Sequence, residues 1–185
     1  MAIRLGSNSI GNNQGDAGGA TPDISFNTTA TIPAGSLLII TVFINSGGNT
    51  NTIGTVTAGG HTFARRVSGQ DVNSSQATAK YDTIVRTDIA SGTTITATIT
   101  GNFFDWIITG VYYVSDWGFI QMVRDATTVQ QTSGTAWATA NQTITKRGMV
   151  HTIVGARVST SNTPDSPGVE DMDLAGTGAQ PMVVV

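Results

Sequence analysis

Short runs of apolar and β-branched residues, separated by turn-forming residues, characterise much of the chain. The clearest pattern is TTITATIT in residues 93–100, where Ile95, Ala97 and Ile99 alternate with threonine. Strict alternation is typical of a strand with one buried face. This stretch therefore predicts a strand whose other face carries hydroxyl groups.

Two other runs have apolar residues on both faces of a would-be strand. SLLIITVFIN (residues 36–45) is nearly continuous and rich in β-branched residues, and FDWIITGVYYVSDW (residues 104–117) is apolar at both parities. A short apolar run bounded by turn residues is consistent with a strand covered on both sides. We therefore expect both strands in the interior, the second at a central position in its sheet.

Turn residues delimit the remaining predicted strands. Residues 24–35 are expected to form a strand that ends in a Pro-Ala-Gly turn. Within residues 55–69, Gly59 and Gly60 suit a tight hairpin turn between two short strands. The segment TAKYDTIVR is expected to form a strand before the alternating one. Further along, we expect Thr/Gln/Ser-rich edge strands in 122–145, a buried strand in 149–159, a loop in 160–180 and a final strand in PMVVV.

These segments amount to about eight to ten short strands, and none of the patterns favours a helix. The fold class predicted is all-β, a single antiparallel β-sandwich of jelly-roll type. A chain of 185 residues is the size of one such domain with an arm.

The opening stretch GSNSIGNNQGDAGGATPD (residues 6–23) raises the question of a phosphate-binding loop. Such a loop needs a lysine at its end or a helix after it, and neither is present. We therefore predict an extended N-terminal arm over residues 1–23 and a sandwich domain over 24–185. The expected partner-docking residues of this arm are Ile3, Arg4, Leu5, Ile10, Asn12 and Asn13.

The composition of the chain limits the kinds of partner and functional site that it can have. Charged residues make up only 11% of the chain, glycine supplies 22 residues and threonine more, so the polar surface is mostly hydroxyl and amide. A net charge of −3 offers no basic stripe for nucleic acid. Without cysteine there is no thiolate metal site and no cysteine nucleophile. No stretch reads as a secretion signal or membrane span, so we expect synthesis in a cytoplasm.

Histidines and carboxylates offer few catalytic arrangements. His61 lies beside the predicted hairpin turn and His151 in an apolar strand, positions typical of a turn residue and a core residue. Asp105 and Asp116 flank the aromatic run as a glycosidase pair would, but that spacing is nonspecific. We predict that the protein is not an enzyme and has no cofactor.

Two other groups suggest binding. An acidic cluster in the loop 160–180 could supply oxygens to calcium, but its spacing does not match an EF-hand, so we predict no metal site. Aromatic residues could stack on sugars, although aromatics at strand spacing are more often core. The acidic residues are Asp165, Glu170, Asp171 and Asp173, and the aromatic ones are Trp106, Tyr112, Tyr113, Trp117 and Trp137.

The succession AGSLLIITVFI, GTVTAGGHTFARRVSG, AKYDTIVRTDIASGTTITATIT and WIITGVYYVSDW resembles β-sandwich modules of bacteriophage virion proteins, such as capsid decoration or fibre-associated proteins. The likeness covers roughly residues 30–120 and is one of pattern and turn chemistry. It implies a fold and a setting, and it carries over no functional residue.

The resemblance implies a structural virion protein, assembled in the host cytoplasm. Our leading expectation is a capsid decoration (cement) protein that binds and stabilises the outer capsid surface. Its expected partners are the major capsid protein or other virion proteins, and sister subunits in a homo-oligomer, with a trimer favoured. The alternative is a receptor- or glycan-binding module of a tail fibre or head fibre, in which an exposed Trp117 or Trp137 stacks on a sugar.

Overall fold

The protein is described by a computed structural model, which defines seven parts of the chain: residues 8–16, 23–45, 52–70, 76–114, 153–155, 172–174 and 182–184. Within these parts the structure is all-β, with antiparallel sheets and no helix. The predicted β-sandwich is confirmed.

In the described parts of the chain, twelve strands form three sheets. The five-stranded sheet has the order β1-β9-β3-β7-β6, the four-stranded sheet β2-β8-β4-β5, and a small sheet β10-β12-β11. Their bounds are β1 Asn8–Asp16, β2 Ile24–Asn27, β3 Leu37–Asn45, β4 Thr52–Ala58, β5 His61–Thr62, β6 Ala64–Gln70, β7 Gln76–Ile84, β8 Thr94–Thr100, β9 Asp105–Tyr113, β10 Ile153–Gly155, β11 Met172–Leu174 and β12 Met182–Val184.

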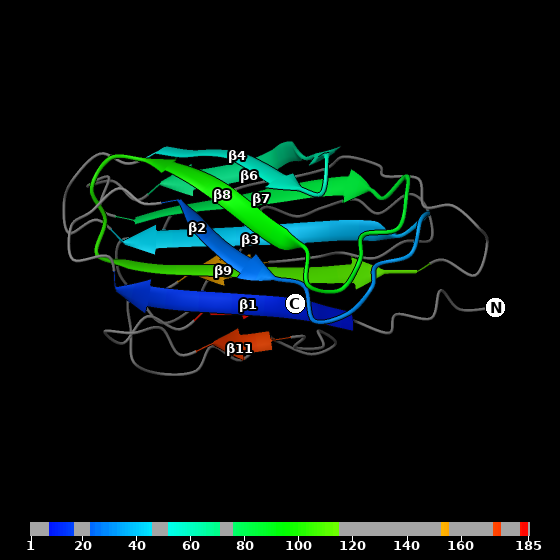
Figure 1. Cartoon of the computed structure of the whole chain (residues 1–185). Coiled ribbons are helices and arrows are strands. Elements are labelled where there is room, and N and C mark those ends of the chain that lie inside the picture. Colours follow the sequence, from blue (N-terminus) through cyan, green and yellow to red (C-terminus); the bar gives the residue numbers. More distant parts are fainter. Residues whose placement is uncertain are drawn as a thin grey trace, which may run out of the picture.

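The two larger sheets lie face to face, with the strands of the four-stranded sheet crossing in front of the five-stranded one (Figure 1). Between β1 and β9 the chain passes back and forth between the two sheets. The strand pairs are nested in sequence, so that each inner pair lies between the two strands of the outer one. Strand β1 pairs with β9, β2 with β8 and β3 with β7. Every pairing within these two sheets is antiparallel.

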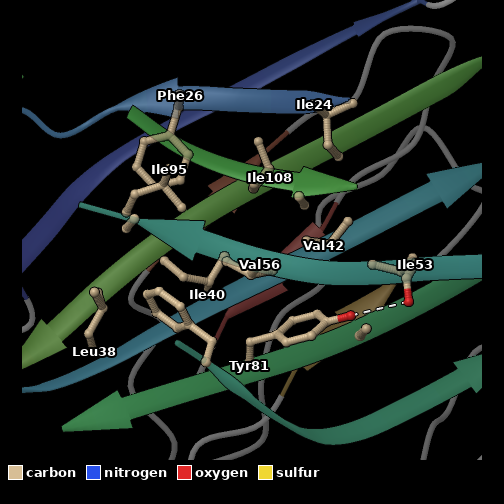
Figure 2. Close-up of a cluster of buried hydrophobic side chains, with 14 of the residues drawn as sticks. Ile24, Phe26, Leu38, Ile40, Val42, Ile53, Val56, Tyr81, Ile95 and Ile108 are labelled. Atoms are coloured by element: carbon tan, nitrogen blue, oxygen red, sulfur yellow. Dashed lines mark hydrogen bonds between the residues drawn. The ribbon is translucent and has the colours of Figure 1, made fainter. Parts of the chain in front are cut away.

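The main hydrophobic core fills the space between the sheets. Strand β8 contributes Ile95, Ala97 and Ile99, all buried, while its threonines point outward, as the alternation predicts. Ile95 lies in one buried cluster with Ile40 and Val42 of β3 (Figure 2), and Ala97 and Ile99 belong to the same cluster.

Both apolar runs lie in the interior. Every residue of β3 is buried, and β9 lies between β1 and β3 with most of its residues buried. On the outer side of the five-stranded sheet, a second buried apolar cluster is formed by Leu37, Ile39, Val111 and Tyr113. The prediction that these two strands are covered on both faces is therefore confirmed.

The hairpin turn at Gly59 and Gly60 is also confirmed, between β4 and the short β5. Both glycines have positive φ, 50° and 83°, which is the conformation that two-residue hairpin turns require. After β5 the chain crosses at the buried Phe63 into β6 of the other sheet.

The strand predicted over 24–35 is shorter than expected. Strand β2 ends at Asn27 because Thr28 is held by the turn between Ala90 and Thr93: its N–H donates to the Thr93 carbonyl and its hydroxyl to the Ala90 carbonyl. Pro33 also lacks the N–H that a continuing strand would use.

Later strands agree with the sequence in part. Strand β10 lies within the predicted strand 149–159, and β12 within PMVVV, whereas β11 lies inside the stretch predicted as a loop. The edge strands predicted in 122–145 lie outside the described residues.

Tyr81 of β7 closes the side of the sandwich where β4 and β6 lie. Its hydroxyl reaches across to the Ile53 carbonyl of β4 at 3.2 Å (Figure 2) and also donates to the Gly54 carbonyl. Arg65 Nη1 donates to the same Ile53 carbonyl at 3.1 Å. Burial raises the pKa of the Tyr81 phenol, with Arg65 opposing the rise. These side chains thus bind backbone carbonyls in the part of β4 that the short strand β5 does not pair with.

Candidate binding surfaces

The outward side of the four-stranded sheet is a neutral polar surface, which we call the hydroxyl face. Its members come from all four strands, and each is exposed or half-buried. They are Ser25, Asn27, Thr52, Thr55, Thr57, Thr62, Thr94, Thr96, Thr98 and Thr100.

Strand register aligns these hydroxyls in rows. Ser25 of β2 lies opposite Thr96 of β8, Thr96 opposite Thr57 of β4, and Thr57 opposite Thr62 of β5. Paired strands lie about 4.8 Å apart, so one row of hydroxyl side chains crosses the whole sheet at that spacing.

Contacts within the face fix several of its side chains. Thr94 Oγ1 donates to Asn27 Oδ1 at 2.8 Å. Thr98 Oγ1 accepts the N–H of Thr55 at 2.8 Å, at the point where a bulge shifts the register of β4. A methyl group at Gly54 would collide with Thr98 Oγ1, so glycine lets the bulge close over this hydroxyl.

The chemistry of the hydroxyl face follows from its composition. Hydroxyls and an amide donate and accept hydrogen bonds, and the threonine methyl groups add small apolar contacts, but no member carries a charge. Such a surface suits a neutral polar partner. The alternation in 93–100 predicts the part of it on β8; the rest depends on strand order, which that pattern does not contain.

The second feature is the site that receives strand β1, which we call the β1 slot. It is formed by Phe26 of β2 and by Trp106 and Gly110 of β9. Ile10 is fully buried in the core beside Gly110. A Cβ at Gly110 would lie 2.7 Å from Ile10 Cδ1 and 2.8 Å from Phe26 Cζ. Glycine at this position therefore leaves the room that Ile10 and Phe26 occupy.

Two further contacts hold β1 along its length. Gly15 lies against the Trp106 ring, 2.9 Å from the ring to the position a Cβ would take. On the side of β1 away from β9, the Ile10 carbonyl accepts the N–H of Thr29, and Asn13 Nδ2 donates to the Ser25 carbonyl, both at 2.8 Å. These bonds connect β1 to the β2 region of the other sheet.

Within the stretch predicted as an arm, residues 8–16 form strand β1 of the five-stranded sheet. Of the arm's expected docking residues, Ile10 is a core residue of its own chain, Asn13 binds the Ser25 carbonyl and Asn12 is exposed; Ile3, Arg4 and Leu5 lie outside the described residues. Residues 8–16 are strand β1, so deleting residues 2–20 would remove a strand of the sandwich together with any docking contact.

Two of the candidate catalytic residues, His61 and Asp105, lie in the described part of the chain, and each has a polar side chain beside it. His61 Nε2 lies 3.4 Å from the Thr87 hydroxyl, and Asp105 Oδ2 accepts a hydrogen bond from Asn45 Nδ2 at 3.1 Å. Trp106 and Tyr112 are half-buried and pack against the core, and Tyr113 is buried, so the structure gives all three aromatics a packing role. The other expected site residues, His151, Asp116, Trp117, Trp137 and the side chains of the acidic cluster, lie outside the described residues.

Among the residues that the structure describes, no three histidine or acidic side chains gather as metal ligands would. The described part of the chain also contains no helix that is long and apolar enough to cross a membrane.

Lys80 lies in a polar row on the outer side of the five-stranded sheet, opposite Thr41, which in turn lies opposite Thr109. Both threonines are buried. Burial lowers the pKa of Lys80 from 10.5 to about 8, partly opposed by the charge of Asp82. This half-buried lysine inside a strand is a feature that the sequence analysis did not identify.

Lys80 should make the protein more stable as pH rises from about 8 to 10.5. In this window the unfolded chain keeps the Lys80 proton and the folded chain has lost it, so unfolding becomes less favourable with increasing pH. Lys80→Met should remove this contribution, measured as the free energy of urea unfolding at both ends of the window. A variant with the same rise as the wild type would contradict the assignment.

Comparison with family models, curated proteins and solved structures finds no match for this chain. The resemblance to virion modules therefore rests on the sequence pattern alone.

Proposed function

We propose that the protein is a structural component of a bacteriophage particle, a decoration protein that binds the outer capsid surface and stabilises it. The observation that carries this proposal is the hydroxyl face, an uncharged polar surface spanning four strands of a rigid sandwich. The proposal gives the chain a binding role and no catalytic one.

The hydroxyl face suits docking onto another protein surface. Threonine side chains are stiff at χ1, and those in the rows are already held by strand pairing, so binding orders few groups. Because the face is uncharged, its attachment to a capsid should depend little on ionic strength, unlike attachment through charged side chains.

The nested pairing of β1 with β9, β2 with β8 and β3 with β7 supports the jelly-roll version of the sandwich within this proposal. The partners we propose are the major capsid protein or another virion protein, together with sister subunits in a closed, symmetric homo-oligomer, for which we favour a trimer.

Thr57→Lys combined with Thr96→Lys should abolish binding to decoration-free capsids, prepared from phage that lacks the coding sequence. The two residues are neighbours in the central row, so the variant places two desolvated charges at the centre of the face. Binding is measured by co-sedimentation at low and at high salt, and the wild type should bind similarly in both.

The matched control is Thr87→Lys, an exposed threonine outside the hydroxyl face. It should bind like the wild type. Circular dichroism and thermal unfolding establish that the double variant is folded. A folded double variant that still co-sediments at the wild-type level would refute the hydroxyl face as the capsid-binding surface.

The same surface favours a second candidate, a glycan-binding module of a phage fibre, because neutral hydroxyls and amides are also the partners that sugar hydroxyls require. In that case the wild type, and not the Thr57→Lys/Thr96→Lys variant, should bind a panel of neutral cell-surface glycans. Capsid binding without glycan binding selects the decoration role.

A further inference from the structure

Strand β1 is held by few apolar contacts. Of its described side chains only Ile10 is buried, while Ser9, Asn12, Asn13 and Gln14 are exposed. A single buried isoleucine supplies only a small part of the hydrophobic stabilisation that a central strand receives from several buried side chains. The strand is therefore attached mainly by its ladder with β9 and by the fit of Ile10 at Gly110, and we expect it to open at lower free energy than the central strands.

The slot that receives β1 is nevertheless specific. Gly110 leaves room for Ile10, Gly15 lies flat on Trp106, and Phe26 fills the remaining space between the sheets. Without β1, strand β9 would be an edge strand with a row of unpaired N–H and C=O groups beside the empty β1 slot. Such a row of unpaired backbone groups is a template for pairing with another strand. The slot therefore requires a strand with the sequence of β1.

The segment that connects β1 to β2 is long enough in sequence for β1 to reach a neighbouring copy of the chain. Residues 17–22, with the sequence AGGATP, separate β1 from residue 23, which precedes β2. Extended, they reach about 20 Å. Every contact in the slot is made to β2 or β9 or to the residues just after β2, and none depends on which copy of the chain supplies β1.

We propose that the β1 slot is an interaction site for a second copy of this chain, in which β1 of one copy occupies the slot of its neighbour. The exchanged pair keeps the β1–β9 ladder and the Ile10 contact, so the balance between the two forms is set by concentration and by the connecting residues. This inference does not depend on a capsid, although neighbouring copies on a particle would favour exchange.

Cysteine pairs test the exchange, because the chain has no cysteine of its own. Asn12 of β1 lies opposite Thr109 of β9. Opposite residues of an antiparallel pair have Cα atoms about 4.5–5.5 Å apart, within reach of a disulfide. The single variants Asn12→Cys and Thr109→Cys are unfolded, mixed at high concentration, refolded and oxidised. We expect a disulfide-linked dimer containing one chain of each variant, identified on a non-reducing gel and by mass.

The control is the pair Thr57→Cys and Thr62→Cys, which also lie opposite each other but are joined by the two-residue turn and so cannot exchange. Their mixture reports random cross-linking between exposed thiols. Co-expression of the two variants with different tags replaces refolding if recovery is poor. The proposal is overturned if the Asn12→Cys/Thr109→Cys double variant cross-links within one chain while the mixed single variants give no more dimer than the control.

Discussion

Gly110→Val should lower the free energy of unfolding by about 1–3 kcal/mol, the usual range for overpacking a well-filled core. Its Cβ would lie 2.7–2.8 Å from Ile10 and Phe26, and the backbone of β9 cannot retreat because β1 and β3 pair with it on both sides. We expect β1 to leave the slot. Denaturant unfolding measures the loss, and hydrogen exchange should show the amides of β1 unprotected while those of β3 stay protected.

A second substitution tests the origin of this loss. Ile10→Ala makes room at the same place, so the cost of Gly110→Val in the Ile10→Ala background should be smaller than in the wild type, a positive coupling in a double-mutant cycle. Strictly additive costs would mean that the clash with Ile10 is not what destabilises the Gly110 variant.

Phe26→Ala should lower the free energy of unfolding by about 3–5 kcal/mol, the usual range for removing a buried aromatic ring. The ring is 5% exposed and lies where β1, β2 and β9 meet, so its loss leaves a cavity and loosens the slot from the other side. Chemical denaturation with tryptophan fluorescence measures the effect.

Phe104→Ala is the matched control for this prediction. Phe104 immediately precedes β9, and its side chain is 42% exposed. The same substitution there should change the free energy of unfolding by less than about 0.5 kcal/mol. Equal losses at the two positions would contradict the packing of Phe26.

The strands that were predicted well from the sequence are those in which the residue pattern of the strand itself indicates which faces are buried. The alternation of Ile95, Ala97 and Ile99 identifies one face of β8, and the continuous apolar run of 36–45 identifies a strand covered on both sides. The two glycines at 59 and 60 identify the hairpin turn because few other residues adopt its backbone conformation.

Strand β1 could not be predicted in this way. A stretch of glycine, asparagine and glutamine with one isoleucine has no periodicity, and its strand structure depends on Gly110 and Trp106, about 100 residues further along. The same limit applies to the rows of the hydroxyl face, because Ser25, Thr57 and Thr96 become neighbours only once the order of strands is known.

Nested pairing also determines when the sandwich can be completed during synthesis. Among the strands of the two large sheets, β1 is made before the others and its partner β9 is made last. At ordinary translation rates the interval is on the order of 10 s. The scarcity of apolar residues in β1 then has a use of its own, since a nascent segment of Gly, Asn and Gln offers little for aggregation or chaperone capture while it waits for β9 to emerge.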